Sequence, residues 1–261
     1  MGLRAPSSGA TPFVAGTQRK NESKRIRVIE PIFISGLLLD LDDTLYAYSP
    51  CHEAGLDAAL AVLIRKTGRA PDVVADAVVH ARKQIHRELF GVAASHNRLL
   101  YFQRTLELLA APRLDAALPA YEAYWTAFLD RMELRPGAME LLTKLPQQCI
   151  CIVTDLTAHI QHRKLHRLGL LSMIGHLVTS EEVGREKPHP AIFQSALRKL
   201  GLPPDGCWVL GDNPAKDLAG AEAAGLSSIW LNIGTAQRDL PVPCLEFSSL
   251  LDVARCITHQ S

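Results

Sequence analysis

From Ile32 onward, short runs of apolar residues alternate with longer stretches in which apolar residues recur every three or four positions. The short runs predict buried strands, and the three-to-four spacing predicts amphipathic helices. Buried strands that alternate with helices are typical of an α/β fold, a central parallel sheet between two layers of helices. The predicted strands are 36–41, 149–154, 176–179, 207–211 and 228–232, and the predicted helices are 138–145, 157–168, 188–200 and 215–224.

A helical insertion interrupts this alternation after the first strand. The 90 residues from 46 to 135 read almost entirely as helix. Ser49-Pro50 suits the start of one helix, a second helix carries Val74 and its apolar partners, a third follows Ser95, and a fourth is expected to start near Pro119. Because parallel strands present ligand sites at their carboxyl ends, the insertion should lie over the residues that follow the first strand.

The first 28 residues differ in composition from the rest of the chain. They are rich in Ser, Thr, Gly and Ala and hold six basic residues and one acid, a net charge of +5, whereas the whole chain carries +1. We expect a disordered basic tail at 1–28, with a transit peptide as the alternative. The expected domains are a core of 29–46 and 136–261 and a helical cap of 47–135.

Global composition excludes several functional classes. The chain is 48% hydrophobic and 21% charged, as in an ordinary globular protein, and its near-zero net charge gives no reason to expect nucleic acid or a membrane surface as a partner. Its six cysteines include no C-x-x-C pair, which argues against a zinc site and a disulfide framework. We therefore expect a cytoplasmic protein, monomeric or homodimeric, without a membrane span.

The stretch LLLDLDDTLY, residues 37–46, leads an apolar strand directly into Asp40, Asp42 and Asp43. Carboxylates crowded at the end of a buried strand repel one another and lose hydration, so they call for a cation or a reaction. The alternative is an ordinary polar turn, since Asp and Thr favour turns. We expect Asp43 either to form the turn or to support the site from behind, and we leave it out of the catalytic set.

Further polar residues follow the other predicted strands. Thr154 and Asp155 end the second strand, Lys187 precedes a helix, and Asp212 and Asp217 follow the strand CWVLG. In a parallel sheet these positions lie at the same edge as Asp40 and Asp42. The sequence therefore predicts one polar site at the carboxyl ends of the strands.

In this order, the motifs resemble those of the haloacid dehalogenase superfamily of hydrolases, in its phosphatase-like branch with a helical cap. D-x-D-x-T matches residues 40–44, the second-motif Thr matches Thr154, the third-motif Lys matches Lys187, and G-D-x-x-x-x-D matches residues 211–217. The resemblance covers roughly residues 35–235. It implies a Rossmann-like three-layer core and a phosphomonoester hydrolase that works through an aspartyl-phosphate.

The resemblance also implies roles for the acids. Asp40 would be the nucleophile, and Asp42 would protonate the leaving group and then accept a proton from water. A Mg²⁺ cofactor would be held by Asp40, the main-chain carbonyl of Asp42, and Asp212. Such a cation would allow several carboxylates to stay ionised at one point.

Thr154 and Lys187 would hold the phosphoryl oxygens, and Asp217 would position Lys187 or a metal-bound water. The chain departs from the family at Asp155, where Asn is frequent. We group Asp155 with the phosphate-binding residues by position, although its carboxylate should repel a phosphate unless it is turned away. Closing a turn is the alternative role for this residue.

An acid at Asp42 favours phosphomonoester hydrolysis over dehalogenation and phosphonate cleavage. A phosphomutase, which needs the same two aspartates, and a catalytically silent binding protein remain the alternatives. Only 32 positions separate Asp155 from Lys187, so there is no room for a second large cap. The helical insertion should then close over a small phosphorylated metabolite, such as a sugar phosphate or nucleotide.

Four residues near this insertion are candidate substrate contacts. Asn97 and Arg98 stand at a predicted helix start, where sugar hydroxyls, a base or a second anionic group would find donors. Tyr46 and His52 lie at the entry to the insertion. A solvated helix end explains the polar residues equally well.

Overall fold

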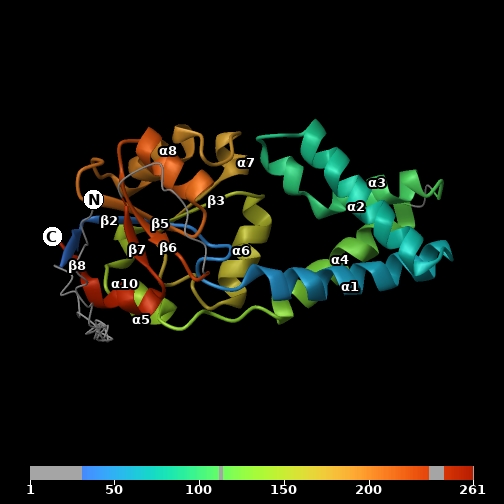
Figure 1. Cartoon of the computed structure of the whole chain (residues 1–261), viewed down its shortest axis with the longest axis horizontal. Coiled ribbons are helices and arrows are strands. Elements are labelled where there is room, and N and C mark those ends of the chain that lie inside the picture. Colours follow the sequence, from blue (N-terminus) through green and yellow to red (C-terminus); the bar gives the residue numbers. More distant parts are fainter. Residues whose placement is uncertain (1–30, 112–113, 235–243, 261) are drawn as a thin grey trace, which may run out of the picture. The chain divides into compact units, whose positions relative to one another are not determined.

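The computed structural model describes residues 31–111, 114–234 and 244–260, so the expected tail at 1–28 lies outside the described residues. Six strands of the described chain form one parallel sheet in the order β4-β3-β2-β5-β6-β7 (Figure 1). This confirms the α/β fold. The strands are β2 (Gly36–Leu39), β3 (Ile150–Thr154), β4 (His176–Thr179), β5 (Cys207–Gly211), β6 (Ser227–Leu231) and β7 (Leu245–Phe247).

Alternate side chains of each strand enter two different apolar layers. Leu37 and Leu39 of β2 belong to one buried cluster, and Leu38 between them belongs to the other. Successive side chains of a strand point to opposite faces, so both faces of this sheet are covered. The first cluster includes residues of α5 (Ala138–Leu142), α6 (Ala158–Arg167) and α10 (Leu250–Cys256), and the second includes residues of α8 (Pro190–Leu200) and α9 (Ala219–Ala223).

The insertion after β2 is helical, as predicted. Its helices α1 and α4 run side by side (Figure 1), and a Cβ at Gly55 of α1 would come within 2.9 Å of the Tyr124 carbonyl oxygen of α4. Trp125 and Phe128 of α4 share a buried cluster with Leu37 of the sheet, so cap and core have one continuous apolar interior. The cap elements are α1 (Tyr48–Thr67), α2 (Pro71–Glu88), the short 3₁₀ helix η1 (Ala93–His96), α3 (Arg98–Leu108) and α4 (Leu114–Asp130).

The predicted start of the fourth cap helix near Pro119 is wrong. Helix α4 begins at Leu114, and Pro119 lies inside it. Proline lacks an N–H and costs the helix one backbone hydrogen bond. The side chains of Ala116 and Ala117 are buried in the cap, and this packing overrides the local proline signal.

A second, two-stranded sheet was not predicted. Strand β1 (Ile32–Ile34) pairs in parallel with β8 (Ile257–His259), which lies near the other end of the described chain. Three-residue strands are too short to show a periodic pattern. No described helix has the length and apolar character needed to cross a bilayer.

Candidate active site

A cavity of about 250 Å³ opens where the carboxyl ends of the strands face the cap. Residues from five separate segments of the core reach it, and the cap forms its remaining wall. The sequence-predicted residues that line it are Asp40, Asp42, Thr154, Asp155, Lys187, Asp212, Asp217 and Arg98.

Lys187 is the buried cation at the centre of the site. Its Nζ lies 2.6 Å from Asp40 Oδ1 and 2.7 Å from Asp217 Oδ1. Burial alone would lower the pKa of Lys187, but the attraction of Asp217 and Asp40 outweighs it and holds the pKa well above its usual value. Lys187 is therefore a fixed positive charge next to Asp40.

Three carboxylates crowd beside this lysine. Asp40, Asp212 and Asp217 each offer an oxygen, and these atoms all lie within 4.8 Å of one another. Burial, followed by repulsion from Asp217 and Asp43, raises the pKa of Asp212 to about 7, and burial also raises the pKa of Asp40. An all-oxygen set with more negative charge than Lys187 neutralises fits a hard divalent cation such as Mg²⁺.

Thr44 and Gly211 explain the spacing of the first and last motifs. The Thr44 hydroxyl donates to Asp40 Oδ2 at 2.7 Å and lies 3.3 Å from Asp212 Oδ1, so it connects the two acids. At Gly211, a Cβ would lie only 2.3 Å from Asp217 Cγ. Only glycine allows Asp217 to fold back over the strand end toward Lys187.

Asp42 has a partner that the sequence analysis missed. Lys164 of α6 places its Nζ 2.6 and 2.8 Å from the two Asp42 carboxylate oxygens, and the Tyr46 hydroxyl also donates to Asp42. Burial alone would raise the pKa of Asp42, but Lys164 and these hydrogen bonds hold it below the usual value. Asp42 is therefore a carboxylate in this structure.

The signal for Lys164 was present in the helical pattern. Ile160, Lys164 and Leu168 are spaced by four, so Lys164 occupies a position where an apolar residue is expected. Its side chain has no exposed surface, and its Nζ lies 5.5 to 5.8 Å from the ring centres of Tyr46, Trp125 and Phe128. A lysine buried among aromatic rings is stabilised by these cation–π contacts and by Asp42.

The second motif is held in place by Gln161. Its amide nitrogen donates to Thr154 Oγ1 at 2.6 Å and to the Asp155 carbonyl at 2.7 Å. The Asp155 carboxylate accepts from the Lys187 backbone N–H at 3.0 Å and pairs with Lys216 at 2.7 Å. The additional acid is thus compensated, and it ties the end of β3 to the segment that carries Lys187.

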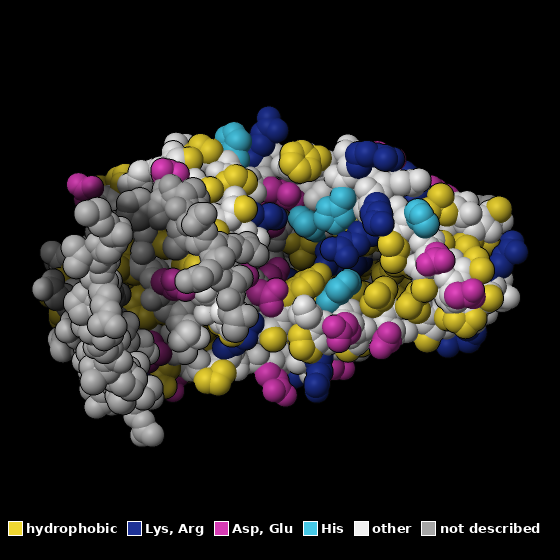
Figure 2. All heavy atoms as spheres, in the orientation of Figure 1, with side chains coloured by type: hydrophobic (Ala, Val, Ile, Leu, Met, Phe, Trp, Pro, Cys, Tyr) yellow, Lys and Arg dark blue, Asp and Glu magenta, His cyan; other side chains and the backbone are white. Residues whose placement is uncertain are grey.

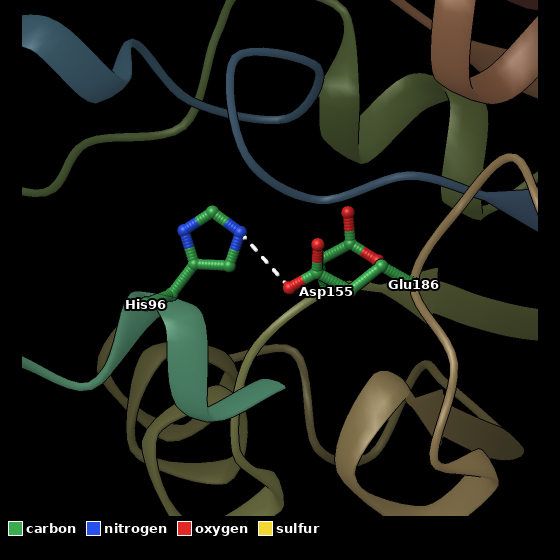
Figure 3. Close-up of side chains that lie close together, drawn as sticks. All are labelled: His96, Asp155 and Glu186. Carbon is green, nitrogen blue, oxygen red and sulfur yellow. Dashed lines mark ion pairs between the residues drawn. The ribbon is translucent and has the colours of Figure 1, made fainter. Parts of the chain in front are cut away.

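Cap and core meet directly beside Lys187. Glu186 accepts from the Ser95 hydroxyl at 3.0 Å and pairs with His96 at 3.1 Å, and its backbone N–H donates to the Gly91 carbonyl at 3.1 Å. Figure 3 shows His96 pointing from the cap toward the carboxylates of Glu186 and Asp155. We call Ser95, His96 and Glu186 the cap latch, since they join η1 to the residue that precedes Lys187.

Of the four candidate substrate contacts, only Arg98 lines the cavity. Asn97 caps α3 by accepting from the Leu99 N–H at 2.9 Å. His52 Nδ1 lies 2.7 Å from the Tyr124 hydroxyl, and Tyr46 is bound to Asp42. Lining residues that the sequence analysis missed include Tyr48, Arg82, His86, His96 and Tyr101 of the cap and Lys164 and Lys216 of the core.

The fold and the site define a hydrolase with an inserted helical cap. Residues 34–225 match the family model for haloacid dehalogenase-like hydrolases, so the chain belongs to that family, among its phosphatases with a helical cap.

Two curated relatives are similar over most of their length. The ribulose-1,5-bisphosphate 5-phosphatase of Halopiger xanaduensis is 42% identical over 200 residues, which cover 75% of this chain and 83% of the relative. The glyceraldehyde 3-phosphate phosphatase of Methanopyrus kandleri is 32% identical over 237 residues, 85% of this chain and 97% of the relative. Both are phosphatases of small sugar phosphates by name.

Solved structures share the fold. A 2-haloacid dehalogenase from Pseudomonas syringae superposes with a TM-score of 0.69 at 24% identity, over 86% of this chain and 98% of that one. The magnesium-bound hydrolase YfnB from Bacillus subtilis superposes with a TM-score of 0.60 at 22% identity, over 85% of this chain and 98% of that one. At these identities the likeness concerns the fold alone.

Proposed function

We propose that the protein hydrolyses the phosphomonoester bond of a small phosphorylated metabolite, with Mg²⁺ as cofactor and through an aspartyl-phosphate on Asp40. The observation that carries the proposal is the cluster of Asp40, Asp212 and Asp217 around the Lys187 ammonium at the cavity floor. It combines a nucleophile, a fixed cation and oxygen ligands for a metal. The names of the curated relatives support the same class of reaction.

In the first step, an oxygen of Asp40 forms a bond to phosphorus while the bond from phosphorus to the leaving oxygen breaks. Asp42 supplies the proton that the leaving oxygen needs, and a phosphate dianion that enters beside Asp42 raises its pKa by repulsion. Lys187 and Thr154 bind the phosphoryl oxygens, where charge spreads in the transition state. When bound by Asp40, Asp212 and the Asp42 carbonyl, Mg²⁺ would neutralise charge shared by nucleophile and phosphate.

In the second step, water attacks phosphorus, its proton passes to Asp42, and the bond between phosphorus and Asp40 breaks. Inorganic phosphate leaves, and Asp40 returns to its carboxylate form. The structure holds Asp42 ionised against Lys164 and Tyr46, which is the form that this second step requires.

The cavity volume favours a small substrate. The cavity volume of about 250 Å³ lies just below the ~300–1,000 Å³ that is typical of pockets for drug-sized ligands. A sugar phosphate or a small nucleotide suits this volume, whereas a phosphoprotein would need an open surface. A phosphomutase uses the same two aspartates and is the second candidate, but both curated relatives described above are named as phosphatases.

The proposal is tested with p-nitrophenyl phosphate as substrate. We expect turnover with Mg²⁺, loss of turnover after addition of a chelator, and recovery when Mg²⁺ is restored in excess. Asp40→Asn should abolish turnover and phosphoryl labelling of the protein, as read by intact mass. Asp57→Asn is a matched control, because Asp57 is exposed on the cap and does not line the cavity. Normal turnover by Asp40→Asn would refute the proposal.

A further inference from the structure

The two walls of the cavity differ in charge. The acids that line it, from Asp40 to Asp217, all belong to the core segments. Figure 2 shows basic side chains, in dark blue and cyan, gathered on one side of the central hollow and acidic ones in magenta on the other. The described cap residues that line the cavity include no carboxylate; they are Tyr48, Arg82, His86, His96, Arg98 and Tyr101.

Arg98 is the central residue of this cap wall. Its residue exposure is only 8%, and its guanidinium donates to the His96 carbonyl and to the hydroxyls of Tyr48 and Tyr124. Among the described residues it forms no ion pair. A buried cation usually has an anionic partner, because burying an unpaired charge is costly. Contacts with aromatic rings, at 5.5 to 5.7 Å, reduce that cost but leave the charge uncompensated.

Arg82 adds a second cation to the same wall, and His86, whose pKa is lowered to about 4 by burial, adds an uncharged ring. Arg82 and His86 are four residues apart on α2, so they lie on one face of the helix. Arg82 is exposed and has no ion pair with any residue that the structure describes. The His86 and His96 rings meet edge to face with their centres 4.8 Å apart. Only His96 pairs with a described carboxylate, that of Glu186, whereas Arg82, His86 and Arg98 do not.

We infer that Arg98 and Arg82 form a subsite for a second anionic group of the substrate, opposite the phosphate that Asp40 attacks. This inference rests on the proposed function and narrows it to metabolites with two anionic ends, such as a sugar bisphosphate or a phosphorylated acid. A planar guanidinium with free N–H groups binds phosphate and carboxylate alike. A substrate with one phosphate leaves this wall uncompensated and binds more weakly.

The test compares matched substrates in the presence of Mg²⁺. Ribulose 1,5-bisphosphate against ribulose 5-phosphate adds a second phosphate, and 3-phosphoglycerate against glycerol 3-phosphate adds a carboxylate. We expect kcat/KM to be about 10- to 100-fold higher for the two-anion member of at least one pair, as charge-assisted hydrogen bonds to the second anion would give. The pair that shows the preference identifies the anion.

Variants connect the preference to the cap wall. Arg82→Gln and Arg98→Lys should each reduce the preference several-fold, mainly by raising KM for the two-anion substrate. Arg87→Gln is the matched control, because Arg87 is exposed on the same helix and does not line the cavity. Arg82 is exposed, so Arg82→Gln gives a result even if Arg98→Lys fails to fold.

Two results overturn the inference: equal kcat/KM within both substrate pairs, or a preference that Arg82→Gln and a folded Arg98→Lys leave unchanged. Failure of the proposed function is distinguishable from either, because an enzyme without phosphatase activity would also leave p-nitrophenyl phosphate intact. Hydrolysis of that probe without any preference for a second anion rejects the subsite alone.

Discussion

Replacement of Lys164 by Met would separate the charge of this side chain from its packing. Met has nearly the length of the lysine stem and fills the space among Tyr46, Trp125 and Phe128 without opening a cavity. The change removes the ammonium that lies 2.6 and 2.8 Å from the Asp42 oxygens. Asp42 is then left with the Tyr46 hydroxyl as the main donor to its side chain.

The size of the effect follows from burial. Loss of one partner from a buried ion pair costs about 3–5 kcal/mol. The Asp42 side chain keeps 29% of its surface exposed, whereas that of Lys164 has none exposed, so water would screen part of the remaining charge. We therefore expect a loss of about 2–3 kcal/mol in the free energy of unfolding at neutral pH, together with a rise in the folded-state pKa of Asp42.

The sign of the pH dependence shows whether the stability deficit of Lys164→Met comes from the lost charge or from poor packing of the new side chain. In the wild type the pKa of Asp42 is lowered, so its stabilising contribution is present above the unfolded-state pKa and is lost as pH falls through the folded-state value. In Lys164→Met the folded-state pKa becomes the higher one, so protonation on acidification relieves the penalty. The difference between the two proteins should therefore shrink by more than half between pH 7 and pH 4.

Urea unfolding at the two pH values measures this difference. Lys199→Met is the matched control, since Lys199 pairs with Glu182 near the surface and its loss should cost less than about 0.5 kcal/mol. A stability deficit in Lys164→Met that is equal at pH 7 and pH 4 would refute the electrostatic argument.

Three further predictions concern the proton donor, the cap latch and a histidine of the cap. With p-nitrophenyl phosphate, whose leaving oxygen can depart without a proton, Asp42→Asn should still allow a phosphoryl group to accumulate on Asp40 while turnover falls by about 10²-fold or more, which intact mass and steady-state rates measure together; unchanged turnover contradicts it. Glu186→Gln should weaken closure of the cap and reduce kcat/KM several-fold, whereas Glu53→Gln on the exposed face of α1 should not; equal rates would remove the latch from the mechanism. Burial, with Arg98 and Arg82, lowers the pKa of His52 to about 4, so the unfolded chain takes up the proton first and stability should fall by about 1 kcal/mol from pH 7 to pH 5. His52→Gln should lose less over the same range in urea unfolding.

Residues whose position depends on local rules were predictable from the sequence. The end of a parallel strand fixes where Asp40, Thr154 and Asp212 lie, because every such strand ends at the same edge. Asp43 was expected to form a turn or to support the site, and it adopts a φ of +65° and accepts from the Tyr48 N–H at 2.9 Å, as a turn residue does. The first prediction depends only on the direction of the parallel strands, and the second depends only on the conformational preference of one residue.

Residues whose role depends on how the cap packs on the core were not predictable. Asn97 and Arg98 are neighbours in the sequence, yet one caps a helix and the other lines the cavity. Tyr46 was a candidate substrate contact, and the structure uses its hydroxyl on Asp42. The direction of each side chain follows from how the cap helices pack on one another and how α4 packs on α6 of the core. The spacing of apolar residues along the chain does not encode this packing.

Lys164 and Arg98 are both buried cations, and they differ in whether a carboxylate lies beside them. Each is a cation that the fold takes out of water, and each contacts the face of Trp125, with centroid distances of 5.8 and 5.5 Å. Lys164 has a carboxylate partner in Asp42, so its charge is already compensated and it acts by positioning that acid. Among the residues that the structure describes, Arg98 is surrounded by hydroxyls, a carbonyl and aromatic rings, and a bound anion would supply the carboxylate or phosphate that it lacks. The same physical rule therefore supports our proposals that Asp42, positioned by Lys164, acts on the attacked phosphate and that Arg98 binds a second anion.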